Sequence, residues 1–479
     1  MSCPLKIMAR PARCARHDGA SAKNGIMIKH NTAPLNPDST REINTTRRTL
    51  LQTAALLMAV PFPLYAGGNE ASRTQQDAAT RGPFLMPDEG APHAATWMAF
   101  GATAEAWGTS GIYGASRNIA RKDLMRIAAN LSRFETVNML VAHPADLRQA
   151  RQLLAEVKDE PTASFAGVAE LPAIEAGGAI QFLLRPLNDL WIRDTGPVFV
   201  RDHHDKLYGV NFNFNGWGQD NTGASGWRKD RQKAANGVTD QPIAQDRLIA
   251  DFVTRTAGAT RLNTWLVMEG GGIEVDGKGT ALCTESCILN PNRNPGRSKQ
   301  EVEAELRRVL GIQKVIWLPG IRGQEITDGH VDFYARFVGD ASVVFALDED
   351  PDSVDYAPTL ANQQILSGAT NALGNKITAI PLKAPDFARV RTAVEARHGW
   401  STGKSSFNTA GFAAGYIGFY LTSCCVLMAK FGDAEADQAA FATLQTLYKG
   451  RAVIQIETDG VANGGGTIHC ATQQQIQAT

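Results

Sequence analysis

Short apolar runs alternate with helical stretches along most of this chain, and this alternation limits its possible folds more than any other feature. A capping-box pattern at Ser298 and Glu301 predicts a helix that ends near Gly311. A second helix is expected over 434–448, ended by Gly450. Strands that alternate with helices predict an α/β fold. The runs expected to be buried strands cover 137–142, 190–200, 315–318, 342–347, 377–380, 426–429 and 452–456.

One arrangement recurs along the chain. A helix, a glycine, a strand and a polar or glycine-rich turn follow one another at 300–320 and again at 435–466. Glu269-Gly-Gly-Gly-Ile273 and Asn463-Gly-Gly-Gly-Thr-Ile468 also resemble each other. A repeated unit would explain both similarities and place Glu269 and Cys470 at related positions. Chance similarity between glycine loops is the alternative.

The N-terminal residues predict a targeting signal that is not part of the folded domain. Arg47 and Arg48 precede an apolar run over 50–60, and residues 61–66 supply a helix break and a cleavage site. This order is typical of a twin-arginine export signal. The run is too short to anchor the mature chain in a bilayer. A buried core helix is the alternative for this run.

We therefore expect an extension and signal at 1–66, a linker at 67–82 and one folded domain at 83–479. The expected location is the periplasm of a Gram-negative cell, reached through the twin-arginine export machinery, with no stable membrane anchor. If the signal does not function, a cytoplasmic location is expected.

Composition and charge narrow the class of protein. Of 479 residues, 43% are hydrophobic and 20% are charged, which is ordinary for a soluble globular protein. The formal net charge of +0 argues against a nucleic-acid partner. The extension at 1–66 holds nine basic and three acidic residues, so the remainder is mildly acidic and suits a cationic ligand. Five of the seven cysteines lie beyond it; an odd number without zinc-ligand spacing predicts at least one free thiol.

Acidic, imidazole and thiol side chains occur beside glycines in turn-like segments. Asp194 comes just before a Gly-Pro turn, and Glu269 is expected at the end of an apolar strand. His330 and Asp332 would project to the same face of an extended segment, because side chains alternate along a strand. Cys470 lies close to the C-terminus. Each residue alone is more typical of a turn, a cap or an inert buried thiol.

Seven stretches in a fixed order change that interpretation. They are Met86-Pro87-Asp88-Glu89 with Thr96-Trp97-Met98, Asn188-Asp189-Leu190-Trp191-Ile192-Arg193-Asp194-Thr195-Gly196-Pro197, Asn211-Phe-Asn-Phe-Asn-Gly-Trp-Gly218, Glu269-Gly-Gly-Gly-Ile-Glu-Val-Asp-Gly-Lys-Gly279, Cys287-Ile-Leu-Asn-Pro-Asn-Arg-Asn-Pro295, Thr327-Asp-Gly-His-Val-Asp332 and Gly464-Gly-Gly-Thr-Ile-His-Cys470-Ala-Thr-Gln-Gln-Gln475. From about Gly82 to the C-terminus, the chain resembles the agmatine deiminase and bacterial (Porphyromonas-type) peptidylarginine deiminase family. This family belongs to the guanidino-group-modifying superfamily.

The resemblance implies a fold and a chemistry. The fold would be a fivefold pseudo-symmetric α/β propeller, the pentein fold, as a single catalytic domain. The reaction would be hydrolytic deimination through a covalent thiouronium intermediate, with no metal or organic cofactor. The resemblance makes Cys470 the nucleophile, His330 the general acid and base, and Glu269 a carboxylate that steadies His330 and the substrate. It assigns substrate binding to Asp194, Asp332, Trp97, Asp189 and Arg193.

These residue types fit such a reaction. A thiolate is a strong nucleophile that is easier to generate than an alkoxide. Carboxylates bind a guanidinium through charge-assisted hydrogen bonds, and two of them fix its plane. Clustered carboxylates raise the pKa of a thiol, and a bound cation offsets that effect. An imidazole can pass a proton to departing ammonia and take one from water.

The resemblance weakens where the substrate's tail would lie. Gly418 stands where relatives carry an asparagine, and Thr422-Ser423-Cys424 stands in place of Ala-Asn-Gly. Gly90 replaces an aromatic residue after the first motif. The identity of the substrate therefore stays open.

Four functions were weighed on these grounds. The leading hypothesis is agmatine deiminase, which forms N-carbamoylputrescine and ammonia for putrescine synthesis. An exported deiminase acting on peptidylarginine, with citrulline as product, is the alternative in the same class. A periplasmic guanidine-binding protein without turnover is a remote alternative. A Cys-His amidase or protease is disfavoured, because the acidic residues around His330 suit a cationic group.

Overall fold

The structure of the protein, a computed structural model, describes residues 82–160, 164–174, 180–219, 241–339, 341–399 and 411–478. These residues belong to one compact unit. The expectations for the signal at 1–66 and for linker residues 67–81 lie outside the described residues. No helix of the described part is long and apolar enough to cross a membrane.

Within the described residues, the strands pair into five separate sheets. One sheet has the order β1 (Phe84–Leu85), β6 (Val198–Asp202), β7 (Leu207–Asn211) and β8 (Thr260–Asn263). A second has β11 (Lys314–Leu318), β10 (Thr280–Thr284) and β9 (Ile273–Val275), and a third has β12 (Ala335–Phe337), β13 (Ser342–Leu347) and β14 (Thr378–Lys383). A fourth has β15 (Tyr420–Leu421), β16 (Cys425–Lys430), β17 (Ala452–Glu457) and β4 (Ser164–Ala166). The fifth has β18 (Gln473–Ile476), β2 (His93–Phe100), β3 (Val137–Val141) and β5 (Ile180–Leu184).

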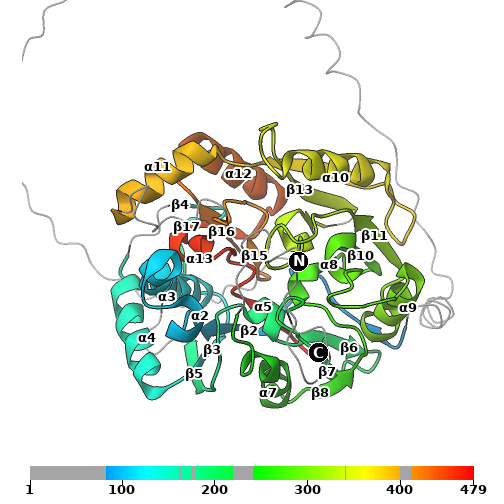
Figure 1. The fold of residues 1–479 in the computed structure, drawn as a ribbon, viewed down its shortest axis with the longest axis horizontal. Helices are drawn as coiled ribbons and strands as arrows, with labels where there is room; N and C mark the ends of the chain where they lie inside the picture. The colour runs from blue at the N-terminus through cyan, green and yellow to red at the C-terminus, as the bar shows by residue number, and fades with distance from the viewer. Residues whose placement is uncertain are drawn as a thin grey trace, which may run out of the picture. The chain divides into compact units, whose positions relative to one another are not determined.

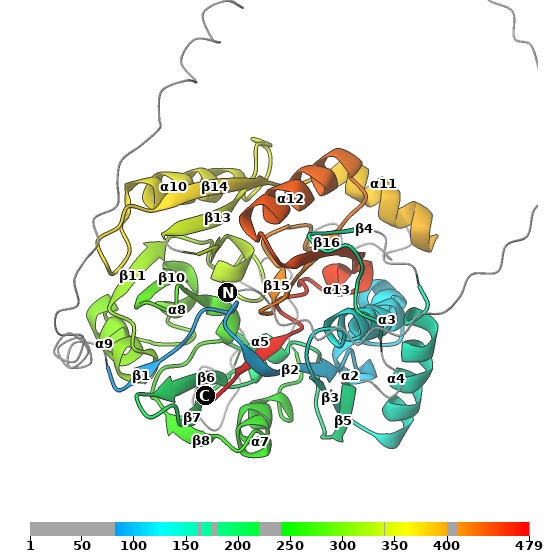
Figure 2. The same ribbon diagram turned by 180° about the vertical axis from the view of Figure 1, so that it is seen from behind.

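Helices connect the strands within and between these sheets. The α-helices are α2 (Ala104–Trp107), α3 (Gly111–Leu131), α4 (Pro144–Val157), α5 (Ile192–Thr195), α7 (Ile249–Thr256), α8 (Glu285–Ile288), α9 (Lys299–Leu310), α10 (Tyr356–Gly368), α11 (Phe387–His398), α12 (Ala434–Leu447) and α13 (Asp459–Asn463). Short 3-10 turns are η1 (Asp246–Leu248), η2 (Gly270–Gly272) and η3 (Val331–Phe333). Helices α4, α7, α9, α10 and α11 lie toward the outside of the unit, while α5 and β15 lie toward its middle (Figures 1 and 2).

All five sheets contain the same supersecondary unit. A first strand pairs antiparallel with a second, and the second pairs parallel with a third after a connecting helix. The units are β6-β7-α7-β8, β9-β10-α9-β11, β12-β13-α10-β14, β15-β16-α12-β17 and β18-β2-α3-β3. The predicted repeat is therefore confirmed and extends to every sheet. In the last unit the first strand comes from the C-terminal end, so that end is held in the sheet of β2.

Local sequence explains where many elements begin and end. Ser298 Oγ accepts the Glu301 amide and the Glu301 carboxylate accepts the Ser298 amide, so the predicted capping box opens α9. Gly311 ends α9 with a φ of 75°, in the left-handed region that glycine adopts at low cost. The strands predicted around β3, β11, β13, β14, β16 and β17 are confirmed, as is the helix at α12.

Three local expectations were wrong. The run 190–200 is not one strand, because its middle forms the turn α5, in which the Thr195 amide donates to the Trp191 carbonyl. Residues 327–332 are not extended, since η3 begins after His330. Glu269 does not end a strand but precedes η2. In each case a short helical turn lies where extended backbone was expected.

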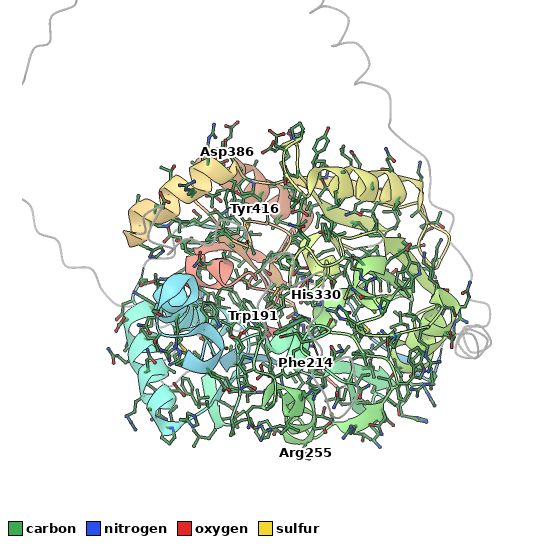
Figure 3. The ribbon with its side chains drawn as sticks, viewed as in Figure 1. Trp191, Phe214, Arg255, His330, Asp386 and Tyr416 are labelled. Atoms are coloured by element: carbon green, nitrogen blue, oxygen red, sulfur yellow. The ribbon has the colours of Figure 1, made fainter. Side chains whose placement is uncertain are left out.

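The largest core cluster packs buried side chains of α3, β2, β3, β16 and β17. Leu124, Met98 and Val141 are fully buried in it. Complete burial of such a side chain stabilises the fold by about 1.5–3 kcal/mol. His330 lies toward the middle of the unit in Figure 3, whereas Arg255 and Asp386 lie at its rim.

Candidate active site

The five residues expected to carry the reaction lie just before the first strand of a repeated unit. Asp194 is in α5, directly before β6, and Glu269 precedes η2 and β9. His330 and Asp332 begin η3, which leads into β12, and Cys470 precedes β18. Equivalent positions in four units therefore supply the thiol, the imidazole and the three carboxylates. This agrees with the predicted relation between Glu269 and Cys470.

Gly271 shows that several of these groups converge. A Cβ atom built on Gly271 would lie 2.5 Å from His330 Nδ1, 3.0 Å from Asp194 Oδ1 and 3.1 Å from Asp332 Oδ2. Glycine is required here by space, because any side chain would occupy the place where the three groups meet. The second glycine of the Glu-Gly-Gly-Gly loop therefore opens the centre of the site.

Cys470 is a free thiol with only 5% of its surface exposed. Its Sγ lies 3.7 Å from Asp332 Oδ2 and 3.4 Å from Thr467 Oγ1. Burial, followed by the nearby carboxylates of Asp332 and Asp194, raises the pKa of the Cys470 thiol well above its ordinary value. Without a bound cation the sulfur is therefore held as the thiol.

His330 lies between two carboxylates. Its Nε2 is 3.0 Å from Glu269 Oε2, and its Nδ1 is 3.7 Å from Asp194 Oδ1. Burial alone would lower the pKa of His330, but Asp194, Cys287 and Glu269 raise it well above the ordinary value. The ring is therefore charged and available as an acid at neutral pH.

Glu269 is fully buried and fixed from two sides. Arg293 Nε donates to both of its oxygens, at 3.0 and 2.9 Å, while His330 contacts Oε2. Burial would raise the pKa of Glu269, but Arg293 and His330 lower it to about 2. Glu269, Cys287 and His330 offer metal-ligand atoms within 4.8 Å of one another. Because Arg293 already neutralises this carboxylate, we assign no metal to it.

The two aspartates expected to hold the substrate have pKa values shifted in opposite directions. Asp194 accepts hydrogen bonds from Trp217 Nε1 at 2.9 Å and from the Gly271 amide at 3.2 Å. Burial, reinforced by neighbouring carboxylates and opposed by His330, raises the pKa of Asp194 to about 6. Burial would also raise the pKa of Asp332, but the hydrogen bond from His469 Nδ1, at 2.7 Å, and nearby cations lower it.

Two buried polar atoms in this cluster lack a hydrogen-bond partner among the described residues. They are His330 Nδ1 and Asp332 Oδ1. Leaving a buried polar atom without a partner costs about 1–3 kcal/mol. Both atoms belong to groups that converge on Gly271. A polar ligand that binds in this buried, charged site could form hydrogen bonds with these two atoms.

Three further residues predicted to bind substrate are not brought to this cluster. Trp97 is 1% exposed, packs in a core cluster and donates Nε1–H to Gln475 Oε1 at 2.9 Å. Asp189 accepts the indole N–H groups of Trp107 and Trp191 at 2.7 and 3.0 Å. These two side chains are engaged inside the protein, where packing and hydrogen bonding fix them.

Arg193 is the third. Its guanidinium donates to Glu89 Oε1 and Gln474 Oε1, each at 2.7 Å, and to the His469 carbonyl at 3.3 Å. Its amide donates to the Cys470 carbonyl at 3.2 Å. Arg193 therefore supports the Cys470 segment instead of facing the open centre.

Several residues near the cluster were not predicted as site residues, and three of them form buried ion pairs there. His469 and Arg293 contact Asp332 and Glu269, and Glu89 contacts His469 Nε2 at 3.0 Å. Each lies in one of the family-like stretches, so the motifs contained the signal. Their roles were not predictable because a buried ion pair joins segments far apart in the sequence.

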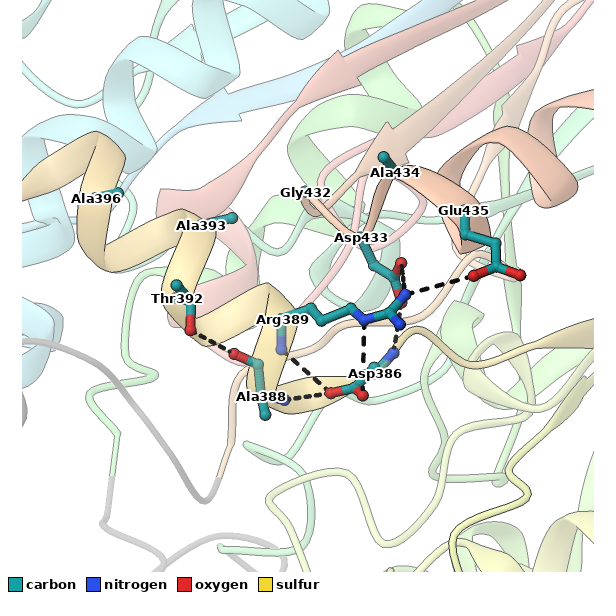
Figure 4. A pocket seen from close by; sticks show the side chains of 10 residues that line it. All are labelled: Asp386, Ala388, Arg389, Thr392, Ala393, Ala396, Gly432, Asp433, Ala434 and Glu435. Carbon is teal, nitrogen blue, oxygen red and sulfur yellow. Dashed lines mark hydrogen bonds and ion pairs between the residues drawn. The ribbon is translucent and has the colours of Figure 1, made fainter. Parts of the chain in front are cut away.

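A groove between α11 and the start of α12 is separate from this cluster (Figure 4). None of the residues predicted to bind or react with substrate lines it. Its Arg389 pairs with Asp433 at 3.1 Å and with Glu435 at 3.5 Å. The guanidinium of Arg389 is thus engaged by carboxylates that line the same groove.

These α/β units and this buried cluster belong to a hydrolase that acts on carbon–nitrogen bonds, as its relatives indicate. The chain belongs to the Porphyromonas-type peptidyl-arginine deiminase family, whose profile matches residues 85–475.

The chain matches several known proteins over nearly the whole length of each of them. A putative agmatine deiminase of Legionella pneumophila (strain Paris) is 30% identical over 393 residues, covering 82% of this chain and 95% of the relative. Agmatine deiminase of Medicago truncatula is 31% identical over 407 residues, covering 82% of this chain and 96% of the relative. The solved structure of agmatine deiminase of Enterococcus faecalis has a TM-score of 0.66 and 27% identity, covering 83% of this chain and 97% of that one.

Proposed function

We propose that this protein hydrolyses agmatine to N-carbamoylputrescine and ammonia. The observation that carries the proposal is the convergence of His330, Asp194 and Asp332 around Gly271, beside the Cys470 thiol. Relatives named agmatine deiminase match this region over almost their entire length. The deep burial of Cys470 and His330 also favours a slender substrate over a bulky one.

Binding would place the guanidinium between the two aspartates. Asp332 Oδ1 has no partner within the described residues and can accept from the guanidinium nitrogens. Asp194, once ionised, can accept from others. Carboxylates on both sides would fix the plane of the group and hold its carbon near Cys470 Sγ. The bound cation would also lower the pKa of Cys470 by offsetting the carboxylates that raise it.

The chemical steps then balance with the groups present. When the guanidinium binds, the Cys470 thiol gives its proton to water. The resulting thiolate uses a lone pair to form a bond to the guanidinium carbon, whose double bond to nitrogen becomes a single bond, and one carbon–nitrogen bond then breaks. His330 gives its proton to the departing nitrogen, which leaves as ammonia. Water next loses a proton to His330 and attacks the thiouronium carbon. Cleavage of the carbon–sulfur bond leaves its electron pair on Cys470. The remaining hydroxyl proton passes to that sulfur, which restores the thiol and releases the ureido product.

The repeated units suggest how the loops reach one centre. We propose that the five units are the blades of a fivefold pseudo-symmetric propeller, with the segment before each first strand directed to the axis. The shared order of strands and helix supports this arrangement. In an experimental structure, a rotation of about one fifth of a turn should superpose each unit on its neighbour. Unequal rotations between neighbouring units would contradict the proposal.

We also propose export to the periplasm, on the twin-arginine pattern at Arg47 and Arg48. Replacing both residues by lysine should leave the protein in the cytoplasmic fraction, and continued export would refute it. Export would favour a second substrate, arginine in peptides, because agmatine metabolism is ordinarily cytoplasmic in this family. A peptidylarginine deiminase is therefore the second candidate.

The test is ammonia release from purified protein with agmatine, free arginine or a peptide containing internal arginine. A colour assay for the ureido group would identify each product. Agmatine turnover that disappears in Cys470→Ala supports the proposal. Turnover of the peptide alone favours the second candidate, and binding without ammonia release from any substrate favours a guanidine-binding protein.

A further inference from the structure

Glu89 is a buried carboxylate that gathers contacts from four separate segments. Its oxygens accept from Arg193 at 2.7 Å, from His469 Nε2 at 3.0 Å, from Arg336 and from the Leu421 amide at 3.1 Å. Burial would raise the pKa of Glu89, but Arg336, His469 and Arg193 hold it well below its ordinary value. The carboxylate is therefore ionised and fully engaged.

This group, here called the Glu89 hub, connects the repeated units. Its members are Glu89, Arg193, Arg336, His469 and Glu274. Arg193 precedes β6, Arg336 lies in β12, His469 precedes β18, and Glu274 lies in β9 and pairs with Arg336 at 3.2 Å. The Leu421 amide adds β15. The hub thus contacts the first strand, or the segment before it, in all five units.

His469 links this hub to the reacting groups. Its Nε2 faces Glu89 Oε1 at 3.0 Å, and its Nδ1 faces Asp332 Oδ2 at 2.7 Å. Only a ring that carries hydrogen on both nitrogens can donate to both carboxylates. The amide of His469 donates to the Gly418 carbonyl at 3.0 Å, so the backbone is also held. His469 is 1% exposed and cannot turn toward solvent.

The pairing decides which oxygen of Asp332 is available. Oδ2 accepts hydrogen bonds from His469 and from the Cys470 thiol, whereas Oδ1 is buried without a hydrogen-bond partner among the described residues. A carboxylate fixed at one oxygen presents the other in a defined direction. Resting on the function proposed above, we propose that His469, held by Glu89, is a positioning residue that aims Asp332 Oδ1 at the guanidinium of the substrate.

A first experiment measures binding without turnover. In a Cys470→Ala background, His469→Gln should weaken agmatine affinity at least about 30-fold in calorimetry, because a buried charged hydrogen bond to Asp332 is lost. Glutamine can keep one donor but not the charge. His398→Gln, which removes a histidine–carboxylate pair with Asp459 at 2.8 Å, is the matched control and should keep wild-type affinity.

A double-mutant cycle separates positioning from general damage. If His469 acts through Asp332, His469→Gln should cause no further loss of affinity in an Asp332→Asn protein. A purely structural role would weaken binding by the same factor in both backgrounds and would overturn the proposal. Melting temperatures of all variants show whether lost binding reflects lost folding.

The pH profile adds a second readout. The charged or titratable groups around Asp332 are His469 and Cys470 on the C-terminal segment, Asp194 and Arg193 on α5, and His330 on its own segment. In an Asp194→Asn protein, where Asp194 no longer titrates near pH 6, removing the His469 charge should move the acidic limb of agmatine affinity to higher pH, because the pKa of Asp332 rises. An unmoved limb would overturn the proposal. If the wild-type protein releases no ammonia from any guanidino compound, the proposed function fails instead.

Discussion

Two buried charged regions lie next to each other along this chain and differ in how completely their charges are satisfied. In the Glu89 hub both oxygens of Glu89 and both of Glu274 accept hydrogen bonds. In the reacting cluster, His330 Nδ1 and Asp332 Oδ1 accept or donate none within the described residues. The hub uses its charges to join segments, whereas the cluster keeps capacity for a ligand. Apart from His469, which also contacts Asp332, replacements should therefore mainly cost stability in the hub and mainly cost function in the cluster.

The largest expected effect is the loss of turnover when the nucleophile of the reacting cluster is replaced. Cys470→Ser should lower agmatine turnover by at least about 10,000-fold, because a serine hydroxyl is far harder to ionise beside Asp332 and Asp194. Agmatine affinity and the midpoint of urea unfolding should stay close to those of the wild type. Steady-state ammonia release, calorimetry and urea titration check the three expectations. Lost affinity would mean that Cys470 also shapes the binding site.

The next effect breaks the hub. Glu89→Gln leaves Arg193, Arg336 and His469 around a neutral amide, and removing one partner of a buried ion pair costs about 3–5 kcal/mol. Urea unfolding should show this loss. Glu435→Gln is a surface control with an 87% exposed side chain and should leave the unfolding midpoint unchanged. Equal stability in the two variants would contradict the distinction between hub and cluster.

The sequence predicted more of the cluster than of the hub, for a physical reason. Cys470, His330 and Glu269 lie in short motifs beside glycines, where turn chemistry and family-like spacing are visible along the chain. The hub joins Glu89 to Arg336 and His469 across 247 and 380 positions. No local pattern records such a pairing, because burial decides it after the units have packed.

The fold shows the same limit at smaller scale. The capping box at Ser298 predicted α9 correctly, since its hydrogen bonds are local. The apolar run 190–200 predicted one strand, but α5 turns inside it and directs Asp194 to the cluster. The motif alone predicted that Arg193 binds the substrate, but its guanidinium forms an ion pair with Glu89. Motifs thus identified the segment and not the direction of each side chain.

A smaller effect sharpens the comparison through pH. The pKa of Asp194 is raised to about 6, so its carboxyl is protonated at pH 5 and ionised at pH 7. Agmatine affinity of a Cys470→Ala protein should rise by up to about tenfold per pH unit below 6 and level off above 7. Calorimetry between pH 5 and 8 measures this. In Asp194→Asn, affinity should be weak and nearly independent of pH over that range.

The raised pKa of Asp194 also affects stability, but in the opposite direction: as pH rises, agmatine affinity should rise and the stability of the empty protein should fall. A carboxyl with a raised pKa stabilises the empty protein below its unfolded pKa near 4, and that contribution is lost as pH rises through about 6. Asp194→Asn should therefore gain stability over the wild type as pH rises from 4 to 7. A constant difference in urea midpoint over this range would contradict the shift assigned to Asp194.

The smallest expected effect concerns Trp97, which was predicted to bind substrate but lies in a core cluster. Trp97→Phe keeps an aromatic ring and removes the 2.9 Å hydrogen bond to Gln475, so it should cost about 1–2 kcal/mol of stability. The KM for agmatine should not change, because the indole contacts β18 and not the space around Gly271. Unfolding and steady-state kinetics on one preparation separate the two outcomes. A KM that rises while stability is unchanged would place Trp97 with the substrate after all, and the division between residues that build the fold and residues that face the ligand would have to be redrawn at β2.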